Sequence, residues 1–266
     1  MLICPKCGKK LYKTDNSYKC SNNHTYDISK EGYINLLLAN QKKQNSGDNS
    51  IQVNARDTFL NNGFYYELTL KIMQIIKSLN IEKNSYILDS GCGTAYYLNI
   101  LNSNLKFKFI GIDISKNAIK KAAKKNIADL LIVASITNIP ILSNSVSLIY
   151  NIFSPYDLQE YNRVLINNGY FVNITPNEKH LYEIKDILYE KPYLNTNKFI
   201  DSNYFEIMNK TTLTYQKTLK NADIINLFTM TPYFYKTNET SKEKLFKIDK
   251  LEVTFDFNVT IYKKRN

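Results

Sequence analysis

The stretch ILDSGCGTA at residues 87–95 decides the fold of this chain, and a related stretch, FIGIDIS, follows at residues 109–115. Each is a short apolar run that ends in an acidic residue, Asp89 in the first and Asp113 in the second. A buried strand, a glycine turn and a second strand carrying a carboxylate form the first half of a doubly wound nucleotide site. Asp113 follows Gly93 by about twenty residues, the spacing at which a carboxylate binds ribose hydroxyls. An ordinary pair of α/β strands joined by a glycine turn is the alternative.

The glycine turn argues against two common nucleotide sites. After Gly91 and Gly93 the chain continues TAYY at residues 94–97, without the third glycine of a dinucleotide site. The sequence contains no G-x-x-x-x-G-K-[ST], which excludes the usual phosphate loop of nucleoside triphosphatases. The acidic Asp89 in front of the glycines instead suits a ligand with a cationic amino acid tail and no phosphate.

These residues resemble the pattern D-x-G-x-G-x-G of the class I S-adenosylmethionine-dependent methyltransferases, with Ala95 in place of the last glycine. The resemblance implies a Rossmann-like α/β domain with a mostly parallel, seven-stranded sheet and an antiparallel edge. It also implies S-adenosylmethionine as the cofactor, with contacts from Asp89, Gly91, Gly93, Thr94 and Asp113, and from Ser135 beside the adenine. Two departures from the pattern are Asn167-Asn168-Gly169 in place of Pro-Gly-Gly, and Ser147 in place of an acidic residue.

Composition places the chain among globular proteins with a polyanionic partner. The chain has 266 residues, of which 44% are hydrophobic and 22% charged, and no apolar run is long enough for a membrane span. The first residues lack the pattern of a signal peptide, so we expect a cytoplasmic protein without a membrane partner. The net charge of +11 favours a nucleic acid partner. An AT-rich genome that encodes many lysines is the alternative explanation of this charge.

A metal site is predicted at the N-terminus. Cys4 and Cys7 form a C-x-x-C turn, and Cys20 and His24 follow at the spacing of a structural zinc site. So short a segment cannot bury a core by itself, and a zinc ion supplies the missing folding free energy. A redox-active C-x-x-C is the alternative, but it leaves Cys20 and His24 without a role.

The run HTYDISKEGYINLLL at residues 24–38, together with the cysteines, resembles the N-terminus of the 23S rRNA (guanine-N1)-methyltransferases. Shorter matches to the same family are SGD at 46–48, AR at 55–56, FLNNGFY at 59–65, TP at 175–176 and MTP at 230–232. The resemblance implies methylation of guanine N1 in a hairpin loop of 23S rRNA by a homodimer whose zinc module binds RNA. It also implies cofactor contacts from Tyr65 and His180.

Three parts of the chain are expected. Residues 1–38 form the zinc module, 39–52 a polar linker, and 53–266 the methyltransferase domain. Within that domain, apolar spacing predicts helices over 51–60 and 65–79 and a helix capped by Ser115 through Lys125. Strands are predicted at 86–88, 109–113, 130–135, 147–153, 170–175, 245–254 and 255–262.

Methylation of guanine N1 requires removal of the N1 proton, so a general base is expected near the cofactor. The candidates are Asp157, Glu160 and His180, and the sequence does not distinguish among them. Two other functions stay open: a methyltransferase acting on a small molecule or another RNA, and a non-catalytic RNA-binding protein. The intact Asp89, Gly91, Gly93 and Asp113 argue against the second of these.

Overall fold

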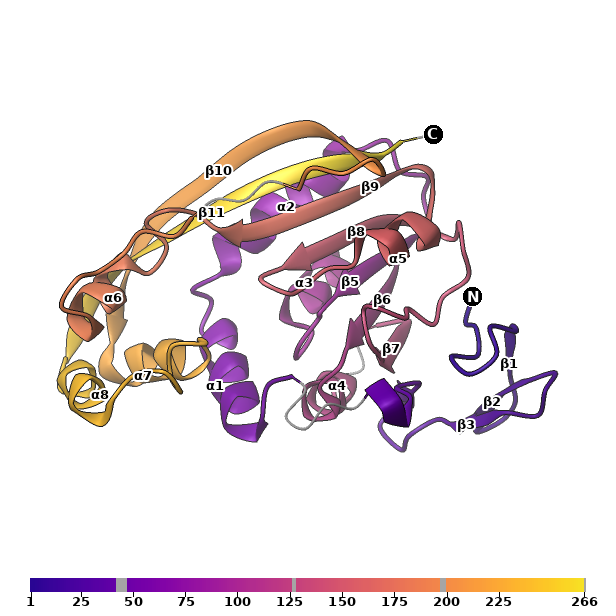
Figure 1. The fold of residues 1–266 in the computed structure, drawn as a ribbon, viewed down its shortest axis with the longest axis horizontal. Coiled ribbons are helices and arrows are strands. Elements are labelled where there is room, and N and C mark those ends of the chain that lie inside the picture. Colours follow the sequence, from indigo (N-terminus) through magenta and orange to yellow (C-terminus); the bar gives the residue numbers. More distant parts are fainter. Residues whose placement is uncertain (42–46, 126–127, 197–199, 266) are drawn as a thin grey trace.

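The computed structural model describes residues 1–41, 47–125, 128–196 and 200–265. One large twisted sheet runs through the protein, and a small three-stranded sheet lies beside it (Figure 1). The strands of the large sheet follow the order β10-β11-β9-β8-β5-β6-β7-β4. In that order they span Phe205–Lys220, Lys250–Lys264, Leu165–Pro176, Val146–Ile152, Tyr86–Ser90, Lys108–Asp113, Leu130–Val133 and Ile34–Asn35.

The pairing of these strands confirms the predicted fold class. From β9 to β4 each pair of neighbours is parallel, whereas β11 and β10 are antiparallel to their neighbours. The order β5-β6-β7 on one side and β5-β8-β9 on the other reverses direction at β5, which is where a doubly wound sheet binds its ligand. An eighth strand, β4, is added to the seven that were expected.

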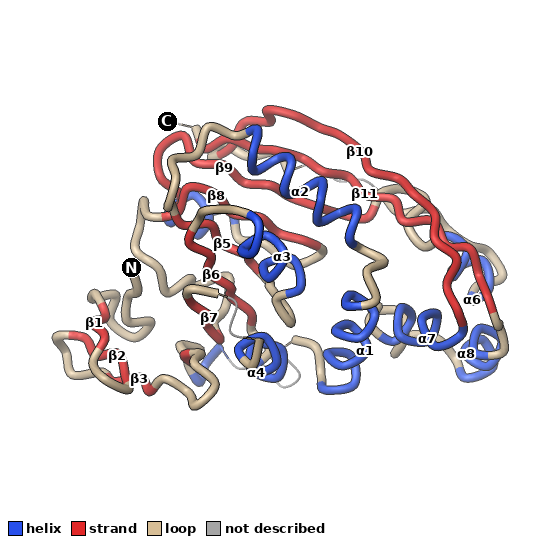
Figure 2. Tube along the Cα trace, turned by 180° about the vertical axis from the view of Figure 1, so that it is seen from behind, coloured by secondary structure: helices blue, strands red, loops and turns tan. Residues whose placement is uncertain are grey.

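Helices cover both faces of the sheet. Successive residues of β5 point to opposite faces, so Ile87 packs in one core and Leu88 in the other. The first core contains side chains of α2 and α3, which Figure 2 shows on the near face of the sheet, and the second contains side chains of α5. The helices span Ser50–Asn61 (α1), Tyr66–Ser78 (α2), Tyr96–Asn104 (α3), Lys116–Ala123 (α4), Leu158–Val164 (α5), Tyr182–Leu188 (α6), Asn221–Thr229 (α7) and Glu239–Phe246 (α8), with a 3-10 turn at Ala39–Gln41. The described part of the chain has no helix that is long and apolar enough to cross a membrane.

The N-terminal segment is joined to the large sheet by backbone hydrogen bonds. Its small sheet consists of β1 (Leu11–Lys13), β2 (Ser17–Cys20) and β3 (Thr25–Asp27), all antiparallel. Beside it, the amide of Ile3 donates to the carbonyl of Pro140 at 3.0 Å, and β4 pairs with β7. The zinc module and the larger domain therefore share one sheet and one apolar core, and the predicted boundary between them stays a prediction.

The predicted helices agree with the structure to within a few residues, but the prediction for the last strands is wrong. Instead of two strands at 245–254 and 255–262, one uninterrupted strand, β11, lies between β9 and β10. Its antiparallel partner is β10, which the sequence analysis missed. Most of β10 alternates between exposed and half-buried residues and carries Thr and Lys, because it forms an edge of the sheet with one face toward solvent.

Candidate active site and metal centre

The predicted metal ligands come together at the base of the small sheet. The ligand atoms of Cys4, Cys7, Cys20 and His24 all lie within 4.8 Å of one another. The sulfurs of Cys7 and Cys20 are 3.7 Å apart, and Nδ1 of His24 is 3.4 Å from the sulfur of Cys4 and 3.5 Å from that of Cys20. A tetrahedron with Zn–S bonds of about 2.3 Å has sulfur–sulfur edges of about 3.8 Å, so this arrangement fits zinc.

The surroundings of Cys4 favour the thiolate, which is the metal-binding form. Burial of Cys4 opposes ionisation, but hydrogen bonds from the Tyr26 hydroxyl and the backbone N–H groups of Lys6 and Cys7 lower its pKa to about 6. The Tyr26 oxygen lies 3.2 Å from the Cys4 sulfur. A thiolate cluster held in this way needs a cation, because adjacent negative charges repel one another.

A cavity of about 290 Å³ lies at the carboxyl ends of β5, β6 and β8. This volume is near the lower end of the range for small-molecule pockets, roughly 300–1,000 Å³. The cavity lies at the point where the strand order reverses, as expected for an open α/β sheet. The lining comes from five segments of the chain, within residues 47–65, 89–97, 113–118 and 152–155 and at Met230.

Two carboxylates line this cavity, one on the buried Asp89 and one on the half-buried Asp113. The carboxylate of Asp113 accepts hydrogen bonds from the amides of Gly93 at 2.9 Å and Ser115 at 2.7 Å, which fix its orientation at the end of β6. Asp89, at the end of β5, accepts one hydrogen bond from the Tyr150 hydroxyl at 2.9 Å. Each oxygen keeps a lone pair for a ligand, since a carboxylate has about four acceptor sites.

Burial changes the ionisation of both groups. It raises the pKa of Asp89 to about 8, against the smaller opposing effect of the hydrogen bond from Tyr150. It also raises the pKa of Asp113, although two backbone amides stabilise the ionised form. Few hydrogen bonds within the protein offset the loss of hydration of these carboxylates. They therefore suit a ligand that brings a positive charge and hydroxyl donors. An amino acid tail with an ammonium group, attached to a ribose, meets both requirements.

The glycine turn between β5 and α3 explains two features of the sequence. Gly91 has φ +83°, and a Cβ atom there would lie 2.2 Å from the Ser154 Oγ, so only glycine lets the two loops approach. Ala95 has φ 58° and therefore occupies the left-handed region, where a side chain is disfavoured. This conformation accounts for the glycine that the methyltransferase pattern has at the position of Ala95.

The loop after β8 is held by a buried polar network. The Asn151 side chain donates to the carbonyl of Pro155 at 2.9 Å and to the Tyr161 hydroxyl at 3.1 Å. The Tyr161 hydroxyl in turn donates to Ser90 at 2.6 Å. Phe153, the first residue of this loop, has a positive φ of 54° and lines the cavity with its partly exposed ring. The network thus fixes the wall of the cavity that carries the partly exposed ring of Phe153.

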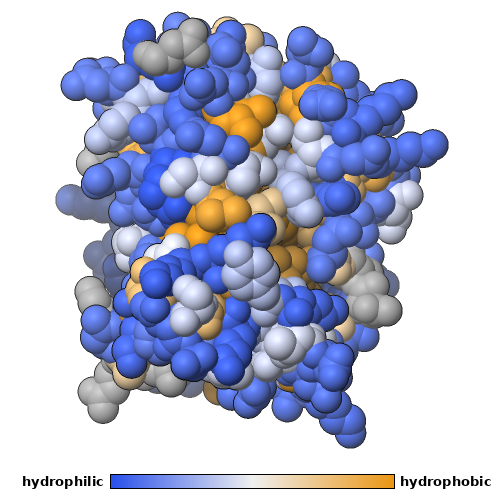
Figure 3. All heavy atoms as spheres, turned by 90° about the vertical axis from the view of Figure 1, so that its right-hand side faces the viewer, coloured by the Kyte–Doolittle hydropathy of each residue, from blue (hydrophilic) through white to orange (hydrophobic). Residues whose placement is uncertain are grey.

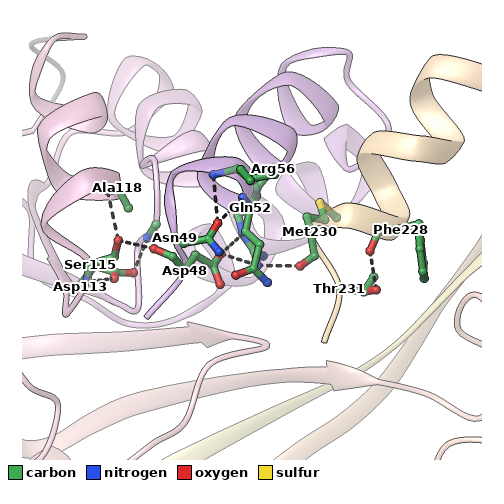
Figure 4. Close-up of polar contacts among 12 residues, drawn as sticks. Asp48, Asn49, Gln52, Arg56, Asp113, Ser115, Ala118, Phe228, Met230 and Thr231 are labelled. Carbon is green, nitrogen blue, oxygen red and sulfur yellow. Dashed lines mark hydrogen bonds and ion pairs between the residues drawn. The ribbon is translucent and has the colours of Figure 1, made fainter. Parts of the chain in front are cut away.

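A second wall is formed by the segment that precedes α1. Asp48 lies between Ser115 on one side and Arg56 on the other (Figure 4). Its carbonyl accepts from the Ser115 hydroxyl at 3.0 Å, and its carboxylate accepts from Nε of Arg56 at 2.8 Å. Nη2 of Arg56 also donates to the carbonyl of Met230 at 3.0 Å. Gly47 and Asp48, predicted to belong to a linker, therefore pack on the cavity, while residues 42–46 of that linker lie outside the described residues.

The structure brings together most of the predicted cofactor residues. Those that line the cavity are Tyr65, Asp89, Gly91, Gly93, Thr94 and Asp113. Ser135, Asp157 and His180 do not line it. Ser135 bonds to Thr137 at 2.8 Å, and Asp157 caps α5 by accepting from the amide of Glu160 at 3.0 Å. Glu160 is paired with Arg163 at 2.7 Å.

His180 lies behind Tyr65, away from the cavity lining. Its Nδ1 accepts from the amide of Asp256 at 3.2 Å, so the proton of the neutral ring is on Nε2, 3.4 Å from the Tyr65 hydroxyl oxygen. Burial lowers the pKa of His180 to about 3, which keeps the ring neutral. This geometry suits a residue that orients Tyr65 and does not suit a proton acceptor.

Four further residues line the cavity without having been predicted as site residues: Asp48, Arg56, Phe153 and Met230. A signal existed for three of them, because SGD, AR and MTP were among the short family matches. Asp48, Arg56 and Met230 come together at the cavity only because α1 packs against α7, and no local sequence pattern predicts that contact.

Comparison with known proteins agrees with this geometry. Residues 2–45 match the family model "RlmA, N-terminal", a zinc ribbon, and residues 88–173 match the model "Methyltransferase domain". A Streptomyces fradiae protein named 23S rRNA (guanine(748)-N(1))-methyltransferase is 29% identical over 190 residues, which are 70% of this chain and 67% of that protein. A Bacillus subtilis protein provisionally named as a 23S rRNA (guanine-N(1)-)-methyltransferase is 28% identical over 98% of this chain and 96% of its own length. The resemblance that the sequence indicated is confirmed.

Among solved structures, the YcgJ protein of Bacillus subtilis is similar, with a TM-score of 0.49 and 14% identity over 75% of this chain and 99% of that chain. A similarity of this size adds nothing to the fold that the strand order already establishes.

Proposed function

We propose that this S-adenosylmethionine-dependent methyltransferase transfers a methyl group to N1 of a guanine in a hairpin loop of 23S rRNA. The observation that carries the proposal is the presence, in one chain, of a zinc ribbon of the RlmA type and a methyltransferase pocket, joined through β4. Relatives similar over most of this chain have names that specify the same reaction. The buried acids of the pocket fit a cofactor that has a cationic tail.

When bound, S-adenosylmethionine supplies an electrophilic methyl group. In our proposal Asp113 binds the ribose hydroxyls and Asp89 binds the ammonium group, which favours the ionised form of Asp89. Tyr65 closes the pocket from the start of α2, and His180 orients its hydroxyl. These residues position the cofactor, and positioning contributes much of the rate of a transfer between two bound groups.

The acceptor guanine would enter beside the loop after β8. Phe153 and Tyr156 are partly exposed there, with 36% and 43% of their surface accessible, and an aromatic ring can stack on an unpaired base. Of the three predicted bases, His180 is held neutral with its proton toward Tyr65, and Glu160 is paired with Arg163. Asp157 lies outside the cavity lining but directly follows Tyr156 at the end of this loop, and it has no ion-pair partner among the described residues, so we propose Asp157 as the group that accepts the N1 proton.

The zinc module offers a surface that suits RNA. The face of the protein on the side of the zinc module is mainly hydrophilic, with apolar side chains near its middle (Figure 3). Tyr12 has 59% of its surface exposed, Lys10 lies over its ring at 5.4 Å, and the β1–β2 register pairs it with Lys19. Lysines interleaved with an exposed aromatic ring can neutralise phosphates and stack on a base. A homodimer, which the resemblance implies, and a cytoplasmic location, which is expected from the sequence, stay predictions.

A substrate comparison tests the proposal. The protein is incubated with S-adenosylmethionine labelled in its methyl group and with 23S rRNA, 16S rRNA or transfer RNA from a strain that lacks the enzyme. We expect label in 23S rRNA and in a transcript of its hairpin, and none in the other RNAs. Labelling of transfer RNA or 16S rRNA alone, or of no RNA while the cofactor still binds, would reject the 23S rRNA assignment and favour another RNA or a small molecule.

A further inference from the structure

One cationic side chain lines a cavity that is otherwise acidic. Asp48, Asp89 and Asp113 line the cavity, and among its described lining residues Arg56 is the only one with a permanent positive charge. A ligand with an amino acid tail brings both an ammonium group and a carboxylate. The acids of the pocket suit the first and repel the second, so the ligand carboxylate needs a separate positive partner.

The position of Arg56 suits the end of the cavity where that tail lies. The side chain comes from α1 and crosses above the glycine turn, with Cδ 3.9 Å from where a Cβ of Gly93 would be. Asp113 marks the ribose end of the same turn, because it accepts from the amide of Gly93. Arg56 and Asp89 therefore approach the turn from different elements, and between them they can bind the two charged groups of one amino acid tail.

The guanidinium of Arg56 is fixed on one edge and free on the other. Nε and Nη2 donate to Asp48, at 2.8 and 2.7 Å, and Nη2 also donates to the carbonyl of Met230. Within the described part of the chain, Nη1 and its two N–H groups have no acceptor. The side chain is 29% exposed and lines the cavity. A planar group with one edge held loses little conformational entropy when the other edge binds a carboxylate.

Asp48 is itself held in place. Its carbonyl accepts from the Ser115 hydroxyl, and the next residue, Asn49, caps α1 by accepting from the amides of Ile51 and Gln52. The start of α1 is thus anchored beside Ser115, and α1 carries Arg56 from there to the glycine turn. Asp48 and Met230 act on the ligand only through Arg56, as positioning residues.

We propose that Nη1 of Arg56 binds the α-carboxylate of S-adenosylmethionine, while Asp48 and the Met230 carbonyl hold the guanidinium plane. The inference rests on the cofactor assignment and is independent of the RNA substrate. It differs from a purely structural role, in which Arg56 would only fasten α1 to the segment at Met230.

Calorimetric binding of two ligands to the unmodified protein gives the first test. S-adenosylhomocysteine has the whole amino acid tail, and its decarboxylated analogue has the ammonium group alone. We expect the analogue to bind about 10- to 100-fold more weakly, as for loss of charge-assisted hydrogen bonds. Equal affinity for the two ligands would overturn the proposal without the need for any variant.

The variant Arg56→Gln assigns the effect to this residue. It should bind S-adenosylhomocysteine about 10- to 100-fold more weakly, yet bind the decarboxylated analogue within about 2-fold of the unmodified protein. Arg56→Lys keeps the positive charge but not the planar set of paired N–H donors. It should give a smaller loss of affinity, and only for S-adenosylhomocysteine. An equal loss of affinity for both ligands would show that Arg56 only holds α1 against the segment at Met230. No loss of affinity for either ligand would show that Arg56 does not contact the carboxylate. Each result would overturn the proposal. Failure of rRNA methylation with these binding results intact would leave this proposal standing.

Discussion

The zinc cluster brings thiolates together and the cofactor cavity brings carboxylates together, and in both sites a bound cation would offset the repulsion between the negative charges. The two sites are nevertheless built in different ways. The four metal ligands lie within residues 4–24, in or near one small sheet. The cavity draws its lining from segments as far apart as Gly47 and Met230. The first site can be recognised from spacing alone, whereas the second exists only after the large sheet and α1 have packed. We therefore expect the zinc cluster to contribute to the structure of the protein and the cofactor cavity to contribute to its chemistry.

Loss of the zinc ligands should have the largest effect. Cys20→Ser should remove about one zinc per chain and leave the N-terminal segment sensitive to protease, because zinc binding contributes folding free energy to so small a module. Methyl transfer to RNA should disappear, while S-adenosylhomocysteine should still bind within a few-fold. Elemental analysis, limited proteolysis and calorimetry measure these three quantities.

Cys92→Ala is the matched control for metal content, since Cys92 lies outside the cluster. It should keep its zinc. A Cys20→Ser protein with a full complement of zinc would contradict the ligand assignment.

The next largest effect is expected at the proposed base. Asp157→Asn keeps an oxygen that can cap α5, but it removes the proton acceptor, so kcat for RNA should fall by about 10²- to 10⁴-fold. The affinity for S-adenosylhomocysteine and the thermal stability should stay close to those of the unmodified protein. Unchanged kcat would exclude Asp157 as the base.

The cofactor cavity should respond to pH through Asp89. Burial raises the pKa of Asp89 to about 8, so below that pH the carboxyl is neutral in the free protein and must lose a proton to bind an ammonium group. The affinity for S-adenosylhomocysteine should therefore fall by up to about tenfold per unit as the pH drops from 8 to 6, and level off above 8. Calorimetry across this range measures the slope.

Two comparisons isolate the cause of that slope. Methylthioadenosine, which has no amino acid tail, should bind with little pH dependence, and Asp89→Asn should remove the slope for S-adenosylhomocysteine. A flat profile for S-adenosylhomocysteine with the unmodified protein would mean that Asp89 does not titrate on binding.

The smallest effect is expected in the core that the two regions share. Tyr161→Phe deletes the hydroxyl that joins Asn151 to Ser90, and should lower the free energy of unfolding by about 1–2 kcal/mol. Zinc content should not change. Chemical denaturation measures the loss, and Tyr12→Phe, at an exposed position, should cost almost nothing.

The same contrast explains how much the sequence could predict. The zinc ligands, the glycine turn and the acids Asp89 and Asp113 lie in short patterns, so their types and spacing were enough to find them. The strand β10 was missed because an edge strand buries only one face, and its Thr and Lys residues look like a polar loop. The roles of Arg56 and Asp48 depend on a contact with Met230, more than a hundred residues away, which spacing does not encode.

The central claim is transfer of a methyl group to N1 of guanine in 23S rRNA. The most direct measurement is mass spectrometry of the nucleosides released from 23S rRNA after incubation with the protein and S-adenosylmethionine that carries a deuterated methyl group. The account predicts 1-methylguanosine with the deuterated methyl and no other labelled nucleoside. Label in a different methylated nucleoside, or none in 23S rRNA, would contradict it.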